Sequence, residues 1–408
     1  MPAKIVILGA GFAGLWSALA AQRLINLANQ TGNIKVLVIA PSATLVLRPR
    51  LYEADAGNMI HPLGPLFAAT GIEFCPGTAQ SIDVKARMVH TQSTDGAEYD
   101  VPYDRLILAT GSSVVQPPSI TGLRQHAFDV DSLKSAAKLD AHLATLQSLD
   151  TSPARDTVVV CGAGFTGIEL AAELPKRLGH IANLRVILVD QAEDLGPELG
   201  PGPRPVITQA LSELGIESRL GSGIQAVDAD GVTLMCGERI ATKTAICTAG
   251  VRATPLTQQI PGPKDSLARV FVDEWLRAPS AKHILVTGDA ACAMADREGH
   301  YALMSCQHAL QLGRVAGHNA AADLLGESLV KYSQAAYLCC LDLGSWGAVI
   351  SGGWERRVQM SGEMAKRVKC YINQKLIYPP EDAHDALRAA NPTGPGSDEL
   401  LQQILQVV

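Results

Sequence analysis

A glycine-rich turn occurs twice in the chain, each time between a run of apolar β-forming residues and an Ala/Leu-rich helix. The first copy spans residues 9–14 (GAGFAG) and the second spans residues 162–167 (GAGFTG). In such a turn the first glycine permits the sharp bend, the second lets a pyrophosphate approach the backbone, and the third lets the helix pack on the strand. The N–H groups at the start of the helix then favour phosphate. Two copies predict two dinucleotide sites.

Length and composition limit the classes of protein to consider. A chain of 408 residues is expected to form two to three domains. The net charge of −6 argues against a nucleic-acid partner, because such proteins carry a basic patch or stripe. No segment holds ~20 uninterrupted apolar residues, so no membrane-spanning helix is expected. Because the first strand is expected to begin by residue 4, we also expect no signal peptide and a cytoplasmic location.

The cysteines do not form a recognisable framework. There are nine, an odd number, and neither a C-x-x-C pair nor a zinc-type spacing occurs. We therefore expect no metal site, and we interpret most of these cysteines as small buried hydrophobic residues in a reducing compartment. Adjacent Cys339 and Cys340 leave a redox pair open as an alternative.

The two units differ at the strand that follows each glycine turn. In this fold an acidic residue usually ends that strand and accepts a hydrogen bond from the adenosine ribose. The first unit ends in Ala40, which weakens the ribose contact there, whereas the second ends in Asp190, 28 positions after Gly162. A carboxylate at Asp190 would repel a 2′-phosphate, so the sequence favours NADH over NADPH.

Further candidate residues follow at strand ends and on one helix. Buried strands end in Ala109-Thr110-Gly111, in 248–250 and in Gly288-Asp289. The Asp289 carboxylate suits hydrogen bonding to a polyol, with an ordinary helix N-cap as the alternative. Residues 303–325 predict a helix on which Gln307 and Gln311, four positions apart, lie on one face, and a solvated polar face is the simple interpretation.

Residues 326–408 predict a smaller C-terminal region. It contains several short strand candidates, a helix near 363–373 and a Pro-rich break at Tyr378-Pro-Pro380. The last residues, 398–408, predict a short amphipathic helix.

With these residues assembled, the chain resembles the flavoproteins that carry two dinucleotide domains, the pyridine nucleotide–disulfide reductase family. The resemblance covers residues 1–325. Five motifs occur in the order typical of that family, at 9–14, 109–111, 162–167, 248–250 and 288–289.

Within that family the chain is most similar to the type II NADH:quinone dehydrogenases. The similarity rests on residues 48–57 (RPRLYEADAG), 162–170 (GAGFTGIEL) and 306–313 (CQHALQLG). The last segment is similar to a family motif whose glutamines border the quinone pocket, with Cys306 in place of an alanine and Leu312 in place of a third glutamine. The C-terminal part departs more, and only the 398–408 helix could serve as a membrane-binding helix.

The resemblance implies an α/β fold with two Rossmann-like domains, as in glutathione reductase, and a small α+β region at the C-terminus. The implied FAD-binding domain is discontinuous, with residues 1–115 and 265–325. The NAD(P)H-binding domain is implied at 116–264, followed by the C-terminal region at 326–408.

The resemblance also assigns site residues. The implied FAD contacts are Gly9, Gly11, Phe12, Ala13, Gly14, Arg48, Pro49, Thr110, Gly111 and Asp289. The implied NADH contacts are Gly162, Gly164, Phe165, Thr166, Gly167, Asp190 and Gly250. Glu169 is implied near the nicotinamide, with a helix-start charge as the alternative role. Gln307 and Gln311 are implied to hydrogen-bond a quinone carbonyl.

The implied activity is hydride transfer from NADH to FAD and electron transfer to a small-molecule acceptor, with quinone favoured. Peripheral contact with the inner face of the membrane is expected, and a homodimer is left open. Two alternatives are an NADH-dependent reductase of a ferredoxin or rubredoxin, and an NADH-responsive flavoprotein of the apoptosis-inducing-factor type. Disulfide reductases fit less well, since residues 15–60 hold no cysteine. A sulfide:quinone relative would need Cys161 with the 339–340 pair.

Overall fold

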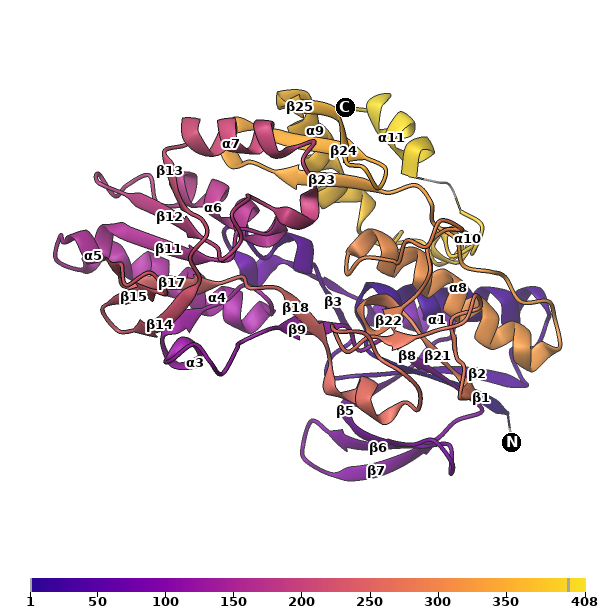
Figure 1. Ribbon diagram of the computed structural model, residues 1–408. Helices are drawn as coiled ribbons and strands as arrows, with labels where there is room; N and C mark the ends of the chain where they lie inside the picture. Colours follow the sequence, from indigo (N-terminus) through magenta and orange to yellow (C-terminus); the bar gives the residue numbers. More distant parts are fainter. Residues whose placement is uncertain (1, 395–396) are drawn as a thin grey trace.

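The computed structural model describes residues 2–394 and 397–408. Two mainly parallel sheets form its frame, and a smaller antiparallel sheet lies at the C-terminal end (Figure 1). The predicted α/β fold with two dinucleotide-binding units is therefore confirmed.

The first sheet has the strand order β20-β21-β8-β1-β2-β5-β6-β7. Its strands are β1 (Ala3–Leu8), β2 (Ile34–Ala40), β5 (Glu73–Asp83), β6 (Met88–Ser93), β7 (Glu98–Pro102), β8 (Arg105–Leu108), β20 (Arg277–Ala278) and β21 (Ala281–Val286). Strands β5, β8, β1, β2 and β21 pair in parallel, and β5–β6–β7 form an antiparallel meander with Asp95-Gly96 in the tight turn between β6 and β7. Because β21 pairs with β8, residues far apart in the chain complete one sheet.

Helices α1 (Phe12–Leu27) and α8 (Cys306–Leu325) pack closely on this sheet. A Cβ on Gly313 would stand 2.5 Å from the Ala13 carbonyl oxygen, and one on Gly317 would stand 2.0 Å from that of Ser17. The two glycines therefore allow the helices to touch backbone to backbone. Helix α8 begins three residues later than predicted because the Ser305 side chain caps it, accepting the N–H of His308.

The second sheet is parallel throughout and has the order β10-β17-β11-β12-β13. Its strands are β10 (Ala127–Phe128), β11 (Thr157–Cys161), β12 (Arg185–Val189), β13 (Ile216–Arg219) and β17 (Thr244–Cys247). All residues of β11 are buried, as expected for a strand covered on both faces. A three-stranded sheet of β14 (Ile224–Asp228), β15 (Gly231–Leu234) and β16 (Arg239–Ala241) adjoins it, and β9 (Ser112–Val114) pairs with β18 (Val251–Ala253) between the two units.

The C-terminal region folds back onto the second unit (Figure 1). Its sheet contains β23 (Leu338–Asp342), β24 (Ala348–Gly352) and β25 (Arg357–Gly362). Strand β23 contacts α6 (Phe165–Arg177), and α9 (Glu363–Tyr371) packs on β24. The remaining helices are α2 (Gly64–Thr70), α3 (Leu123–His126), α4 (Leu133–Thr145), α5 (Pro153–Asp156), α7 (Arg204–Glu213), α10 (Ala383–Ala389) and α11 (Ser397–Leu405). Along the described residues, no helix is long and apolar enough to cross a membrane.

Candidate active site

A cavity of about 1750 Å³ lies where the two units and the C-terminal region meet. Both glycine turns line it, as do residues at the start of α8, Lys369 near the end of α9 and residues of α11. Segments that are separated by hundreds of residues in the chain therefore surround one continuous space.

The first glycine turn has the geometry of a phosphate cradle. Gly9 has φ +109°, and a Cβ on Gly14 would stand 2.0 Å from the Gly9 carbonyl oxygen, so neither position admits a side chain. A Cβ on Gly11 would meet none of the described atoms within 4 Å. Among the described residues no side chain caps α1, which begins at Phe12. The turn therefore presents backbone N–H groups to the cavity and fits a pyrophosphate.

The second turn repeats this backbone but not its surroundings. Gly162 has φ +122°, and a Cβ on Gly167 would stand 1.8 Å from the Gly162 oxygen. Here the Phe165 N–H donates a hydrogen bond of 2.7 Å to Oε1 of Glu198, and the same oxygen lies 2.7 Å from the position of a Cβ on Gly164. A carboxylate from the 3₁₀ turn Pro197–Leu199 thus stands where a phosphate would bind. The sequence analysis missed Glu198, because only folding brings its Gly/Pro-rich loop over the turn.

Asp190 directly follows β12 and lies beside the second turn, as predicted. Its Oδ2 accepts the N–H of Ala163 at 2.6 Å, and its Oδ1 accepts the N–H of Ala192 at 2.8 Å. Both bonds orient the carboxylate at the edge of the cavity, where carboxylate oxygens still have acceptor capacity for a ribose hydroxyl.

The residues expected around FAD gather on the other side of the cavity. Asp289 accepts a hydrogen bond of 2.6 Å from the Ser112 hydroxyl and lies 3.5 Å from the Arg48 guanidinium. Arg48 also forms an ion pair with Asp131. The predicted site residues that line the cavity here are Gly9, Gly11, Phe12, Ala13, Arg48, Pro49, Thr110, Gly111 and Asp289, and those on the side of the second unit are Gly162, Gly164, Phe165, Thr166, Asp190 and Gly250. Gly14 and Gly167 are not among the residues that line it.

Gln307 and Gln311 both line the cavity from the first turns of α8. The Gln311 side-chain amide donates a hydrogen bond of 2.6 Å to the Pro392 carbonyl oxygen. Residues Leu401 and Ile404 of α11 line the same cavity. Both glutamines are half-buried, and Gln311 contacts the C-terminal region instead of lying on a fully solvated face.

Glu169 forms a buried ion pair with Lys369 of α9, with Nζ 2.8 Å from Oε1. Oε1 also accepts the backbone N–H of Asp342 at 3.0 Å. Burial raises the pKa of Glu169 to about 7, against the opposing effect of the Lys369 charge. For Lys369 burial lowers the pKa, but the Glu169 carboxylate more than offsets this, so its pKa is raised. The pair therefore holds a proton that can be exchanged near neutral pH.

The sequence analysis missed Lys369, although a signal existed. Lys369 is four positions after Ala365 and three before Ile372, so it lies on the buried face of an otherwise amphipathic helix. A lysine on that face requires a buried partner.

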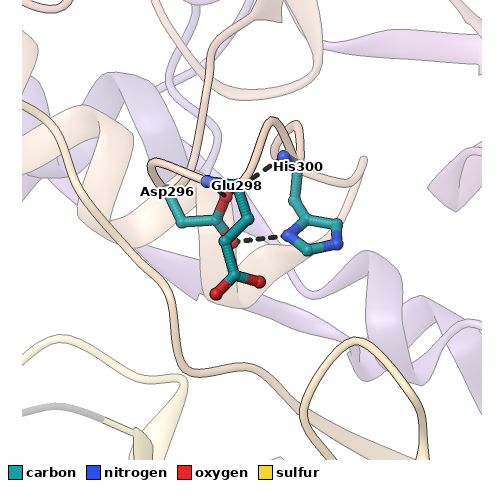
Figure 2. Close-up of side chains that lie close together, drawn as sticks. All are labelled: Asp296, Glu298 and His300. Carbon is teal, nitrogen blue, oxygen red and sulfur yellow. Dashed lines mark hydrogen bonds and ion pairs between the residues drawn. The ribbon is translucent and has the colours of Figure 1, made fainter.

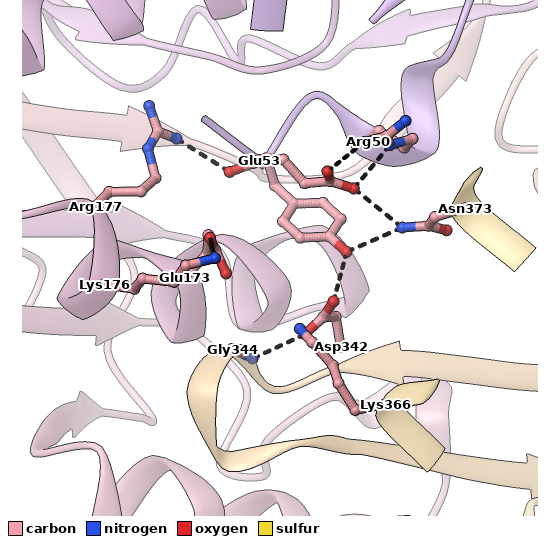
Figure 3. Close-up of polar contacts among 10 residues, drawn as sticks. Arg50, Glu53, Glu173, Lys176, Arg177, Asp342, Gly344, Lys366 and Asn373 are labelled. Atoms are coloured by element: carbon pink, nitrogen blue, oxygen red, sulfur yellow. Dashed lines mark hydrogen bonds and ion pairs between the residues drawn. The ribbon is translucent and has the colours of Figure 1, made fainter. Parts of the chain in front are cut away.

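Asp342, whose N–H bonds Glu169, belongs to a polar network that reaches Lys366 and Glu53 (Figure 3). The Asp342 carboxylate accepts hydrogen bonds from the Tyr52 hydroxyl at 2.9 Å and from the half-buried Lys366 ammonium. Burial raises the pKa of Tyr52 well above its usual value, so the hydroxyl stays protonated. Asn373 bridges Glu53 and Tyr52. The 48–57 segment, α6 and the C-terminal region are thus fastened together around Glu169.

Three other residues have the composition of a metal site (Figure 2). One ligand atom from each of Asp296, Glu298 and His300 lies within 4.8 Å of the others. Oδ1 of Asp296 accepts hydrogen bonds from the backbone N–H groups of Glu298 and His300. Oδ2 of Asp296 lies 2.6 Å from Nδ1 of the His300 ring. These bonds account for the cluster as a side-chain-capped turn, and none of the three residues lines the cavity described above.

All nine cysteines are free. Cys306, Cys339 and Cys340 line the cavity, and burial raises the pKa of the Cys340 thiol to about 12. Cys161 is buried in β11, as predicted. Burial raises the pKa of Cys161, Cys306 and Cys339 as well, so these three and Cys340 are protonated thiols at neutral pH.

Comparison with known proteins agrees with this architecture. The sequence profile of the pyridine nucleotide-disulphide oxidoreductase family matches residues 3–313. An NADH dehydrogenase-like protein of Mycobacterium tuberculosis is 43% identical over 398 residues, which cover 95% of this chain and 98% of the relative. A type II NADH:quinone oxidoreductase of Staphylococcus aureus is 24% identical, covering 92% and 95%.

The fold is also found in a solved structure of NDH2 from Plasmodium falciparum in complex with NADH. Its TM-score to this chain is 0.75 at 14% identity, and the match covers 95% of this chain and 98% of that one.

The family match spans both glycine turns and the start of α8. The predicted likeness to type II NADH:quinone dehydrogenases is confirmed, as are the predicted enzyme class and the cofactors FAD and NADH. This protein is thus an FAD-dependent oxidoreductase that takes electrons from NADH, and the chain belongs to the pyridine nucleotide-disulphide oxidoreductase family.

Proposed function

We propose that this oxidoreductase passes the electrons from NADH to a quinone. One observation carries the proposal: a continuous cavity joins the two glycine turns to Gln307, Gln311 and the buried Glu169–Lys369 pair. Relatives of similar length are named for this acceptor, including a demethylphylloquinone reductase of Synechocystis that is 26% identical over 92% of this chain.

We assign FAD to the first unit and NADH to the second. The turn at 9–14, Arg48, Thr110 and Asp289 would hold FAD, and the turn at 162–167 would hold NADH. Bound FAD would supply the two-electron chemistry, accepting hydride from the nicotinamide and returning electrons to the acceptor. The N-terminal end of α8 would stabilise negative charge on the reduced flavin through its backbone N–H groups and the helix dipole.

Quinone reduction also needs a proton from solvent, because a quinone takes up two electrons and two protons while NADH brings two electrons and one proton as hydride. Glu169 and Lys369 hold a proton at the cavity wall. Asp342 bonds Glu169 through its N–H and pairs with the half-buried Lys366, so this contact leads from the pair toward the surface. In the proposal this pair supplies the second proton, and Gln307 and Gln311 orient the quinone carbonyl.

The acceptor would reach the cavity from a membrane surface. Helix α11 contributes Leu401 and Ile404 to the cavity, while Leu405 and Val407 beside them are 37% and 64% exposed. In this arrangement the C-terminal helix contacts lipid and opens a path for an apolar acceptor.

Gln311→Leu tests the quinone site. We expect it to slow turnover with a short-chain quinone by about 10-fold, the effect of removing one hydrogen bond to a substrate carbonyl. Turnover with ferricyanide should be unchanged, because that dye takes electrons without entering the quinone site. Both rates are measured from NADH consumption.

Gln209→Leu is the matched control, since Gln209 lies on the surface of α7 and bonds Glu213. If Gln311→Leu slowed turnover with quinone and turnover with ferricyanide equally, the assignment of Gln311 to a quinone site would be wrong. Faster electron transfer to a ferredoxin or rubredoxin than to any quinone would replace the quinone with a protein acceptor.

A further inference from the structure

Arg356 is a buried cation that the assignment above does not use. It lies at the tip of the hairpin between β24 and β25 and is 6% exposed. Among the described residues, no carboxylate oxygen lies within 4.0 Å of its guanidinium, and its Nη1 has no hydrogen-bond partner. A buried N–H donor without an acceptor is costly, so the fold retains the Nη1 group of Arg356 at a free-energy cost.

The backbone and neighbours of Arg356 hold its side chain in one place. Its φ of +55° is left-handed, an uncommon conformation for a residue other than glycine. The guanidinium carbon lies 4.5 Å from the centroid of the Tyr337 ring and 6.0 Å from that of Trp354. His308 stacks on Tyr337 at 4.8 Å, and burial together with the Arg356 charge lowers the pKa of His308 to about 3. The neighbouring imidazole is therefore neutral, and Arg356 is the positive charge of this cluster.

The side chain of Arg356 lines the cavity next to the loop that covers the second glycine turn. A Cβ on Gly200 would stand 3.3 Å from Arg356 Cγ, and one on Gly202 would stand 2.3 Å from the Arg356 carbonyl oxygen. The same loop places Glu198 on the Phe165 N–H. One short segment thus lies between the start of α6 and the Arg356 hairpin.

We propose that Arg356 binds a phosphate of the pyridine dinucleotide, on its nicotinamide side. The C-terminal region would then supply a third anion-binding element, in addition to the glycine turn and the start of α6. The inference rests on the assignment of NADH to the second unit and is independent of the acceptor.

Two features favour the nicotinamide side. Asp190, the expected ribose contact on the adenosine side, bonds the N–H groups of Ala163 and Ala192 at the C-terminal end of β12. Arg356 instead lies at Tyr337, whose ring stacks on His308 in the first turn of α8. A planar guanidinium with free N–H donors matches a phosphate, which accepts bidentate hydrogen bonds.

The test measures equilibrium binding to the FAD-loaded, oxidised protein by titration calorimetry. The probes are NAD⁺, nicotinamide mononucleotide, which keeps only the nicotinamide-side phosphate, and nicotinamide riboside, which has none. We expect Arg356→Gln to weaken NAD⁺ and the mononucleotide by about 10- to 100-fold, the range for a hydrogen bond to a charged group, and to leave the riboside unchanged. Arg356→Lys should restore part of the loss, since it keeps the charge without the fork.

Arg357→Gln is the matched control, because the Arg357 side chain is 83% exposed and pairs with Glu355. An equal loss for the riboside, or a lower content of bound FAD in Arg356→Gln, would overturn the proposal. So would equal affinity of the wild-type protein for the mononucleotide and the riboside, a result that requires no variant. Gly167→Ala tests the assignment of NADH to the second unit separately from the role of Arg356. If the Gly167→Ala variant binds NAD⁺ as tightly as the wild-type protein, that assignment is wrong.

Discussion

Three buried charged residues define the chemistry of the cavity at the scale of single side chains. Glu169 and Lys369 satisfy each other, whereas Arg356 has no carboxylate partner among the described residues. Buried charges are expensive unless they are paired or hydrogen-bonded. The unpaired charge therefore indicates a ligand, and the paired charges indicate a proton store.

Glu169→Gln should abolish the pH dependence of the rate of quinone reduction near neutral pH. With its pKa raised to about 7, Glu169 carries its proton below pH 7 and loses it above. Reoxidation of the pre-reduced wild-type protein by a short-chain quinone should therefore slow as pH rises through 7. In the variant the rate should be about 100-fold lower and independent of pH between 6 and 8, since general acid catalysis contributes at least that factor. Stopped-flow absorbance of the flavin measures both.

Glu173→Gln is the control for this experiment, because Glu173 is also buried on α6 but pairs with Lys176 outside the cavity. An unchanged inflection near pH 7 in Glu169→Gln would assign the titration to another group.

At the scale of elements, the two strand-turn-helix units share one backbone geometry but differ in the residues that lie over the glycine turn. The face of Gly11 has no described neighbour within 4 Å, while Gly164 is covered by Glu198. A carboxylate at a helix N-terminus is stabilised by the same N–H groups that bind phosphate. In the proposed assignment Glu198 would therefore compete with the dinucleotide for the start of α6.

Glu198→Gln should tighten NAD⁺ binding. Removing the competing charge at the helix start is worth about 0.3–1 kcal/mol, or about 2- to 5-fold in affinity. Calorimetric titration of the oxidised protein measures the change.

Glu193→Gln serves as a control in the same loop, because Glu193 is exposed. Weaker NAD⁺ binding in Glu198→Gln would instead make Glu198 a contact that supports the bound dinucleotide.

At the scale of the whole molecule, the C-terminal region completes a site that the two dinucleotide units begin. Lys369, Arg356, Leu401 and Ile404 all reach the cavity from residues 326–408. The buried Tyr52–Asp342 hydrogen bond fastens that region to the first unit. The region thus acts as a wall of the cavity.

Replacing Leu405 and Val407 together by serine should weaken attachment to lipid vesicles. Leu405 ends α11 and Val407 follows it, both are exposed apolar residues, and burying such side chains is worth about 1.5–3 kcal/mol each. Cosedimentation with vesicles should fall by at least about 10-fold, while ferricyanide turnover stays unchanged.

The control is the pair Leu27→Ser and Met235→Ser, which are also exposed apolar residues but lie on α1 and beside β15. Equal loss in the control pair would mean that lipid contact is not specific to α11.

Much of the fold and part of the site could be predicted because their signals are local. Residues 9–14 and 162–167 carry their own strand, turn and helix, and the glycines are required by backbone contacts within or next to the turn. Asp190 was found because it ends the strand that pairs with the turn's own strand. The start of α8 was misplaced by three residues, since the sequence pattern does not show that Ser305 caps it.

The sequence by itself determined the two nucleotide-binding units, since a strand, a glycine turn and a helix are specified by neighbouring residues. Only the tertiary structure decided what surrounds them. Lys369 meets Glu169 across 200 positions of chain, Glu198 covers a turn that begins at Gly162, and Arg356 approaches from a hairpin in the last region. Such contacts depend on how separate hydrophobic faces pack, which the pattern of any one segment does not encode.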